Sequence, residues 1–192
     1  MILFNNLDKF FKNTSVIFVD SRVKKDNKIT VDDLVFFVDK DNNISSINVL
    51  DNNKYLISND SKFGTLNFES INKIEIAASK AGLKISNEPK FIYGLIKTRS
   101  AHPKSERLFV LEVLINDEKT IQIVTNTLDS HEGKVVVLAL PGATTFAGTD
   151  ILSGEMLGVK SEGMLTGYRT LGIDKDGLIF GTENEIGKDF VL

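Results

Sequence analysis

Six cationic side chains could meet phosphate groups, and three of them lie close together along the chain. Arg99, Lys104 and Arg107 fall around His102, all within nine residues. Guanidinium and ammonium groups form charge-assisted hydrogen bonds to phosphate oxygens, which position a protein on a nucleic-acid backbone. The segment therefore predicts a phosphate-contacting loop. Three further lysines would extend it if the chain closes into a barrel, namely Lys97, Lys134 and Lys160.

The two histidines have few possible chemical roles. His102, which precedes Pro103, either contacts a base or phosphate or simply caps a surface loop, and both interpretations stay open. His131 lies in a polar turn, where we expect it to be solvated. The sequence contains no cysteine, which excludes disulfides, thiolate zinc sites, iron–sulfur clusters and thiol nucleophiles. We expect neither a metal nor a cofactor.

No arrangement of residues in the sequence resembles a catalytic motif. Carboxylates are not paired, serine is not matched with histidine, and no glycine-rich loop carries a lysine. An enzyme is therefore the least favoured class. We expect a binding module without catalytic residues.

Charge and composition describe a globular chain that is not basic. Hydrophobic residues make up 42% and charged residues 26% of 192 residues, and the net charge is −3. Residues 90–192 carry 11 Lys and Arg against 14 Asp and Glu. Any nucleic-acid binding must therefore come from a local cluster rather than from the overall field. The first residues lack a secretory signal, and no apolar run approaches the roughly 18 residues of a membrane span, so we expect a cytoplasmic protein.

The first half reads as short strands followed by one helix. Apolar runs at residues 15–19, 34–38 and 44–50 predict strands, and the Asn- and Asp-rich residues 39–43 predict a hairpin turn. Helical spacing of apolar residues predicts a helix over residues 68–82, with Gly82 as its C-terminal cap. We therefore expect residues 1–88 to form a small α+β domain, whose role the sequence does not reveal.

The second half, residues 89–192, reads as strands throughout. Four runs with short connections predict a small closed β structure: residues 91–97, 108–114, 121–124 and 134–140. A glycine interrupts the first run at Gly94, as a bent barrel strand requires. A fifth strand is expected within residues 162–168, and residues 178–180 could supply a sixth.

Three segments of this half resemble the tRNA-binding domain of the phenylalanyl-tRNA synthetase β subunit and of free-standing structure-specific tRNA-binding proteins. The segments are Tyr93-Gly94-Leu95-Ile96 with His102 to Leu108, Ile121 to Asn126 with Glu132 to Ala143, and Leu157 to Leu165. The whole chain is similar to the two-domain YtpR-type bacterial proteins. The resemblance implies a mainly β fold with a five-stranded OB-fold β-barrel in residues 89–192, which recognises tRNA by its shape and phosphate backbone.

The resemblance also implies that Asn126, Ser161 and Met164 face the RNA. From the residues alone, Ser161 could equally bind a neighbouring backbone group, and Met164 could fill the core. The predicted RNA-binding set is therefore Lys97, Arg99, His102, Lys104, Arg107, Asn126, Lys134, Lys160, Ser161 and Met164.

One departure from the family lowers the expected affinity for tRNA. Ser153, Glu155 and Leu157 stand where the family commonly has two lysines and an arginine. Because affinity scales with the number of phosphates neutralised, we expect weakened binding. The alternative is a protein-interaction or assembly module that docks onto an aminoacyl-tRNA synthetase or another translation protein. The sequence leaves open whether the chain forms oligomers.

Overall fold

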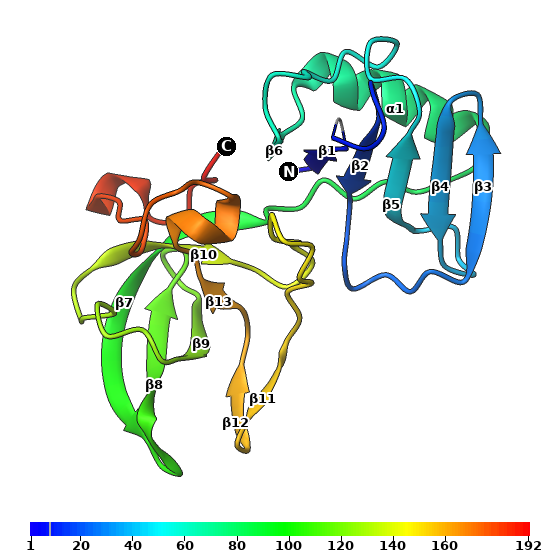
Figure 1. The fold of residues 1–192 in the computed structure, drawn as a ribbon. Helices are drawn as coiled ribbons and strands as arrows, with labels where there is room; N and C mark the ends of the chain where they lie inside the picture. The colour runs from blue at the N-terminus through cyan, green and yellow to red at the C-terminus, as the bar shows by residue number, and fades with distance from the viewer. Residues whose placement is uncertain (8) are drawn as a thin grey trace. The chain divides into compact units, whose positions relative to one another are not determined.

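The computed structural model describes residues 1–7 and 9–192, which form two compact units (Figure 1). The first unit comprises Met1–Glu88 together with Gly142–Phe146 and Val191–Leu192. The second comprises Pro89–Pro141 and Ala147–Phe190. Strands dominate both units, which confirms the predicted mainly β fold class.

A six-stranded antiparallel sheet and one helix build the first unit. The strands lie in the order β3-β4-β5-β2-β1-β6. Their bounds are β1 (Leu3–Asn6), β2 (Ser15–Phe18), β3 (Asn27–Val31), β4 (Leu34–Val38), β5 (Ile44–Val49) and β6 (Phe63–Thr65). Helix α1 (Phe68–Lys80) begins where the Asn67 side chain accepts a hydrogen bond from the Ser70 amide at 2.8 Å. It buries Ile74 against Ile17, Phe36 and other apolar residues of the unit's core.

Apolar patterning found the most strongly buried elements of this unit. The predicted strands at residues 15–19, 34–38 and 44–50 correspond to β2, β4 and β5, and the predicted helix corresponds to α1. The sequence did not reveal β1, β3 or β6. Strand β3 is mostly exposed and polar, and β6 has only three residues, so neither shows a clear alternation of apolar and polar side chains.

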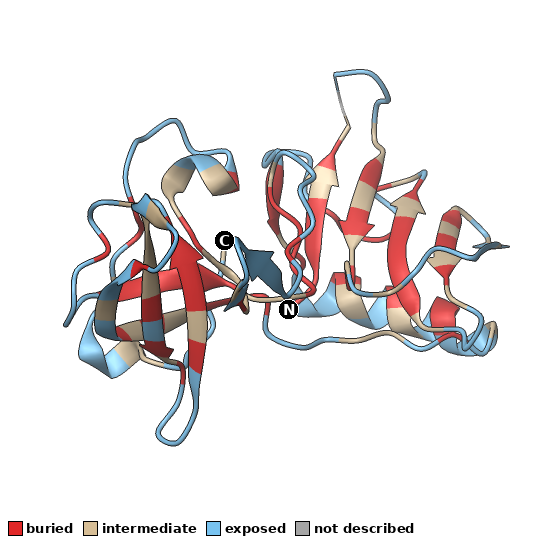
Figure 2. Ribbon diagram, turned by 90° about the horizontal axis from the view of Figure 1, so that it is seen from below, coloured by how far each residue is buried: buried red, intermediate tan, exposed pale blue. Residues whose placement is uncertain are grey.

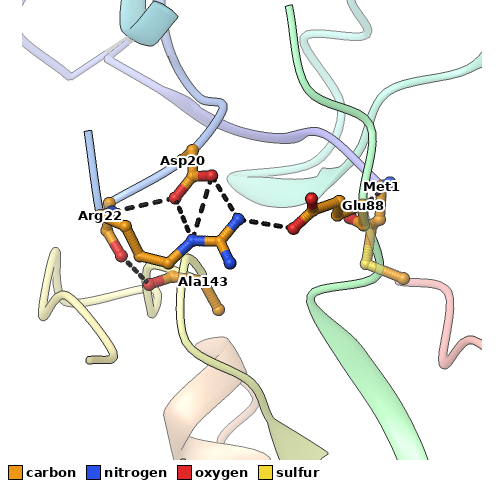
Figure 3. Close-up of polar contacts among 6 residues, drawn as sticks. Met1, Asp20, Arg22, Glu88 and Ala143 are labelled. Atoms are coloured by element: carbon orange, nitrogen blue, oxygen red, sulfur yellow. Dashed lines mark hydrogen bonds and ion pairs between the residues drawn. The ribbon is translucent and has the colours of Figure 1, made fainter. Parts of the chain in front are cut away.

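A polar cluster within the first unit joins segments that are distant in sequence (Figure 3). The Arg22 guanidinium binds the buried carboxylate of Asp20 at 2.6 Å and Glu88 at 2.5 Å. The hydrogen bond that Arg22 donates to Asp20 raises the pKa of Arg22, so the guanidinium stays charged. Next to it, the Ser21 hydroxyl donates to the Ala143 carbonyl at 3.0 Å. The cluster thus connects Glu88, the last residue of the segment Met1–Glu88, and the later segment Gly142–Phe146 to the residues around Asp20 in the first unit.

A five-stranded sheet with a separate hairpin builds the second unit. The strands of the sheet lie in the order β13-β10-β7-β8-β9. Their bounds are β7 (Phe91–His102), β8 (Ser105–Leu114), β9 (Thr120–Thr125), β10 (Val135–Ala139) and β13 (Met164–Leu165). Strands β11 (Gly154–Met156) and β12 (Val159–Ser161) form the hairpin. Two short 3-10 helices, η1 (Tyr168–Leu171) and η2 (Glu183–Glu185), follow β13.

The possible sixth strand at residues 178–180 does not form. The Ile179 carbonyl accepts from the Val137 amide of β10, whereas the Ile179 amide donates to Thr166, just after β13. Because the segment divides its hydrogen bonds between two neighbours, it makes only isolated bridges at Leu178 and Phe180.

Close packing explains the glycine in β7. A Cβ atom at Gly94 would lie 2.6 Å from Leu138 Cδ1 and 2.8 Å from Val113 Cγ1, in the core of the second unit. Gly94 is therefore needed for space rather than for an unusual backbone angle, which refines the expectation that it serves backbone geometry. Figure 2 shows the buried residues concentrated along the strands of each unit.

Candidate nucleic-acid interface

His102 ties the turn between β7 and β8 to the β11–β12 hairpin. Its Nδ1 atom accepts a hydrogen bond from the Lys104 amide at 3.1 Å, and its Nε2 atom lies 3.0 Å from the Met156 carbonyl oxygen. Because a carbonyl can only accept, the two contacts assign the proton to Nε2. The ring is 4% exposed and both nitrogens are engaged. His102 is thus placed to position the turn, and its ring is not open to a stacked base.

Lys104 in this turn and Arg107, the third residue of β8, are exposed cations, and residues 103–107 are called the cationic turn below. The Lys104 ammonium lies against the hairpin, since a Cβ atom at Gly158 would stand 3.2 Å from its Nζ atom. Among the described residues, no carboxylate forms an ion pair with either side chain. Both charges are therefore available to an external phosphate. Figure 1 shows the turn between β7 and β8 and the turn of the β11–β12 hairpin at the same end of the second unit.

The hairpin itself carries little positive charge. Lys160 pairs across the strands with Glu155 and its Nζ atom lies 2.8 Å from Glu162 Oε1. The hydrogen bond from Lys160 lowers the pKa of Glu162, so the carboxylate stays ionised and neutralises the lysine. At the tip, Leu157 and Gly158 have φ angles of 51° and 83°, as a two-residue type I′ turn requires. The Leu157 side chain is 57% exposed there.

An open pocket of about 400 Å³ lies beside the hairpin and contains three residues of the predicted set. These are Asn126, Ser161 and Met164. Apolar side chains form much of the remaining lining: Leu108, Val124, Ile151, Leu152 and Met156. The charged residues that line it are both acidic, Asp150 and Glu155.

Ser161 has a structural role in this pocket. Its hydroxyl accepts from the Val124 amide at 3.0 Å and donates to the Gly163 carbonyl at 3.2 Å, and the residue is 8% exposed. It therefore joins β12 to β9, as the backbone-binding alternative expects. Asn126 is exposed and Met164 is half-buried, so both remain accessible from the pocket.

The remaining predicted cations lie on β7 and on the loop before β10. The Arg99 guanidinium stacks on the Phe109 ring, 3.6 Å from its centroid, and the Arg99 backbone amide donates to Glu132 Oε1 at 2.7 Å. Lys97 occupies the irregular position of β7 opposite β8, next to Ile96, whose amide donates to the Lys134 carbonyl. These hydrogen bonds join β7 to the loop before β10.

The structure thus separates the ten predicted residues into three groups. Lys104 and Arg107 form the free cationic turn, with His102 beneath it. Asn126, Ser161 and Met164 line the pocket, and Lys160 is paired on the hairpin. Lys97, Arg99 and Lys134 lie on β7 and on the loop that its backbone contacts before β10.

Sequence reasoning missed the hairpin as an element, together with the apolar pocket residues Leu152 and Met156. The two-residue turn at Leu157-Gly158, with glycine in its second position, could have indicated it. Within residues 1–7 and 9–192, no group of three or more His, Asp and Glu side chains is placed to hold a metal ion. The same residues contain no helix long and apolar enough to cross a membrane.

A five-stranded sheet that presents a cationic turn beside an apolar pocket defines an OB-like binding module. Residues 91–188 match the family described as "Putative tRNA binding domain", and the chain belongs to this family. The match covers the whole sheet of the second unit together with the hairpin.

Two curated relatives are named as a tRNA-binding protein and as a subunit of a tRNA ligase. The chain is 31% identical over 113 residues to "Putative tRNA-binding protein YtpR" of Bacillus subtilis, which is 56% of each chain. It is 34% identical over 98 residues to the phenylalanine–tRNA ligase beta subunit of Latilactobacillus sakei subsp. sakei, which is 51% of this chain and 12% of that one. The matched residues therefore span about half of the first relative and a small part of the second.

Among solved structures, a MetRS related protein from Pyrococcus horikoshii has a TM-score of 0.38 and 22% identity. The similarity covers 52% of this chain and 87% of that one.

Proposed function

We propose that this chain is a non-catalytic tRNA-binding protein of the cytoplasm that recognises tRNA by its shape and phosphate backbone. The observation that carries the proposal is the pair of free cations, Lys104 and Arg107, on an exposed turn of the family-matched unit. Phosphate contacts of this kind supply most of the affinity of a protein that binds nucleic acid without reading its sequence.

The contact surface combines the cationic turn with the pocket. Lys104 and Arg107 bind consecutive phosphates, and the pocket beside them accepts the sugar edge or an unstacked base. Met164 offers a polarisable contact to a base, and the Asn126 amide can both donate and accept a hydrogen bond. Arg99 contributes less, because its guanidinium is stacked on the Phe109 ring.

The same geometry accounts for a reduced affinity. Lys160 is neutralised by Glu162, and the hairpin tip presents Leu157 where a cation would be favourable. Two free cations give a dependence of log K on log salt of about −1.4 to −1.8. We therefore expect binding that is measurable at low salt and weak at physiological salt.

A double substitution with a charge-matched control tests this function. Lys104→Ala with Arg107→Ala should weaken binding of total tRNA by more than about tenfold at low salt, equally for different tRNAs. Lys119→Ala with Lys188→Ala removes the same charge near the opposite end of β8 and should change affinity by less than about twofold. Gel-shift titration of both variants measures the difference. Equal losses in the two variants would refute the assigned surface.

The pocket favours a second candidate, a protein-docking module in translation. Its charged lining, Asp150 and Glu155, would repel phosphate and attract a lysine or arginine beside an apolar anchor. A synthetase or another translation protein could supply such a segment. Two results together would favour protein docking over tRNA binding. Co-purifying proteins would stay bound after nuclease treatment, and the wild-type protein would not retard tRNA in a gel-shift assay.

A further inference from the structure

The first unit displays two adjacent phenylalanines on the loop between β1 and β2. Phe10 is 76% exposed and Phe11 is 63% exposed. Three other phenylalanines of the unit are buried: Phe4, Phe36 and Phe63 are exposed by 7% or less. Two neighbouring aromatic rings that face solvent, while the core is filled by others, indicate a contact surface.

Hydrogen bonds tie the described residues of the loop to its base. The Leu7 amide donates to the Thr14 carbonyl at 2.9 Å. The Phe10 and Phe11 amides both donate to the Leu7 carbonyl, at 2.8 Å and 2.9 Å. The backbone amides of both phenylalanines are therefore engaged, which reduces the entropy lost when their rings bind a ligand.

Two lysines flank the rings. Lys9 and Lys12 lie on either side of them in the sequence, and the Lys9 ammonium lies 5.5 Å from the Phe10 ring centroid. The Lys62 ammonium donates to the Asn6 carbonyl at the base of the loop. In the sequence the two lysines of the loop outnumber its one acid, Asp8.

Exposed aromatic faces with cations beside them fit one ligand chemistry. Single-stranded nucleic acid offers bases that stack on aromatic rings and phosphates that meet lysines. We propose that residues 9–12, with Lys62, form a second nucleic-acid site that binds unpaired nucleotides of RNA. Two bases stack on Phe10 and Phe11, and the lysines contact the adjoining phosphates.

An anionic membrane fits the loop less well. Lipid binding of this kind uses an amphipathic helix or clusters of about 4–8 Lys and Arg. The loop is a turn with two lysines, and residues 1–89 carry 12 cations against 12 acids. RNA needs only a local contact, and stacking on each ring changes affinity by roughly 5- to 150-fold.

The sequence contains no tryptophan, so Phe10→Trp creates a fluorescent reporter on the loop alone. Titration of the full chain with an oligouridylate of about 12 nucleotides should quench this fluorescence as bases stack. Phe68→Trp is the matched control, because Phe68 is 81% exposed on the same unit but precedes Glu69. Its fluorescence should stay unchanged over the same range.

Further variants test the predicted contacts. Phe11→Ser in the Phe10→Trp protein should weaken the binding of oligouridylate by at least about fivefold. Lys9→Ala with Lys12→Ala should reduce the salt dependence of log K by about 1.4. Quenching that is absent, or equal in the Phe68→Trp control, would overturn the proposal.

Two further measurements distinguish this site from the tRNA site of the second unit and from a membrane contact. Lys104→Ala with Arg107→Ala, placed in the Phe10→Trp protein, should leave oligouridylate quenching intact even where tRNA binding is lost, so the two sites fail separately. Vesicles of phosphatidylcholine with phosphatidylserine should not shift the emission. A blue shift with vesicles and none with oligouridylate would replace the RNA site with a membrane contact.

Discussion

Replacing His102 by alanine should lower the free energy of unfolding of the second unit by about 2 kcal/mol. The substitution leaves the Lys104 amide and the Met156 carbonyl without their protein partner, and each such loss costs about 1–3 kcal/mol. Water can reach the neighbouring exposed turn and replace part of each bond, so the lower end of that range applies to both.

Two conservative variants distinguish the contributions of the two hydrogen bonds of His102 to stability. In His102→Asn the amide oxygen can take the place of Nδ1 and accept from Lys104, and it should restore about half of the loss. In His102→Gln the amide nitrogen can take the place of Nε2 and donate to Met156. His131→Ala removes an exposed histidine and should change stability by less than about 0.5 kcal/mol.

Urea unfolding followed by circular dichroism measures these differences, and gel shift at low salt measures tRNA affinity of the folded variants. We expect His102→Ala to keep tRNA affinity within about threefold, since the ring is buried and engaged. A variant that is as stable as wild type but has lost tRNA would refute the structural role and make His102 an RNA contact.

Two further outcomes follow from the same unit. Glu162→Gln should destabilise the protein by less than about 1 kcal/mol at pH 7, because Lys160 is 62% exposed. Since Lys160 lowers the pKa of Glu162, this advantage exists above the unfolded value of about 4.3 and disappears as pH falls through the lower folded value, so the urea midpoints of the two proteins should converge as the solution is acidified below that value. Gly94→Ala should cost about 1–3 kcal/mol by overpacking against Leu138 and Val113, whereas Gly154→Ala, with no atom within 4 Å, should be neutral in the same assay.

The sequence predicted those elements that carry a continuous apolar run or a helical repeat. Strands β4 and β10 were found because each is an uninterrupted run of apolar residues, and helix α1 was found because its apolar residues recur with the period of a helix. The hairpin β11–β12 was missed, since β11 is exposed at every position and has no continuous apolar run. Short elements of this kind form through tertiary contacts, here the hydrogen bond from the Val124 amide to the Ser161 hydroxyl.

The candidate site was predictable in its residue types but not in its pairing. The cations near His102 could be read from spacing, whereas the hydrogen bond from the Arg99 amide to Glu132 depends on how β7 meets the loop before β10. The pairing of Lys160 with Glu162 likewise depends on side-chain direction at the end of the hairpin. Sequence order alone does not bring these charges together.

Filter binding of total tRNA to the wild-type protein, between about 50 and 200 mM salt, tests the central claim most directly. Two free cations on the turn between β7 and β8 predict retention at the lowest salt and a slope of log K against log salt of about −1.4 to −1.8. Absence of retention at the lowest salt, or a slope near zero, would contradict the claim that this turn binds the phosphate backbone of tRNA.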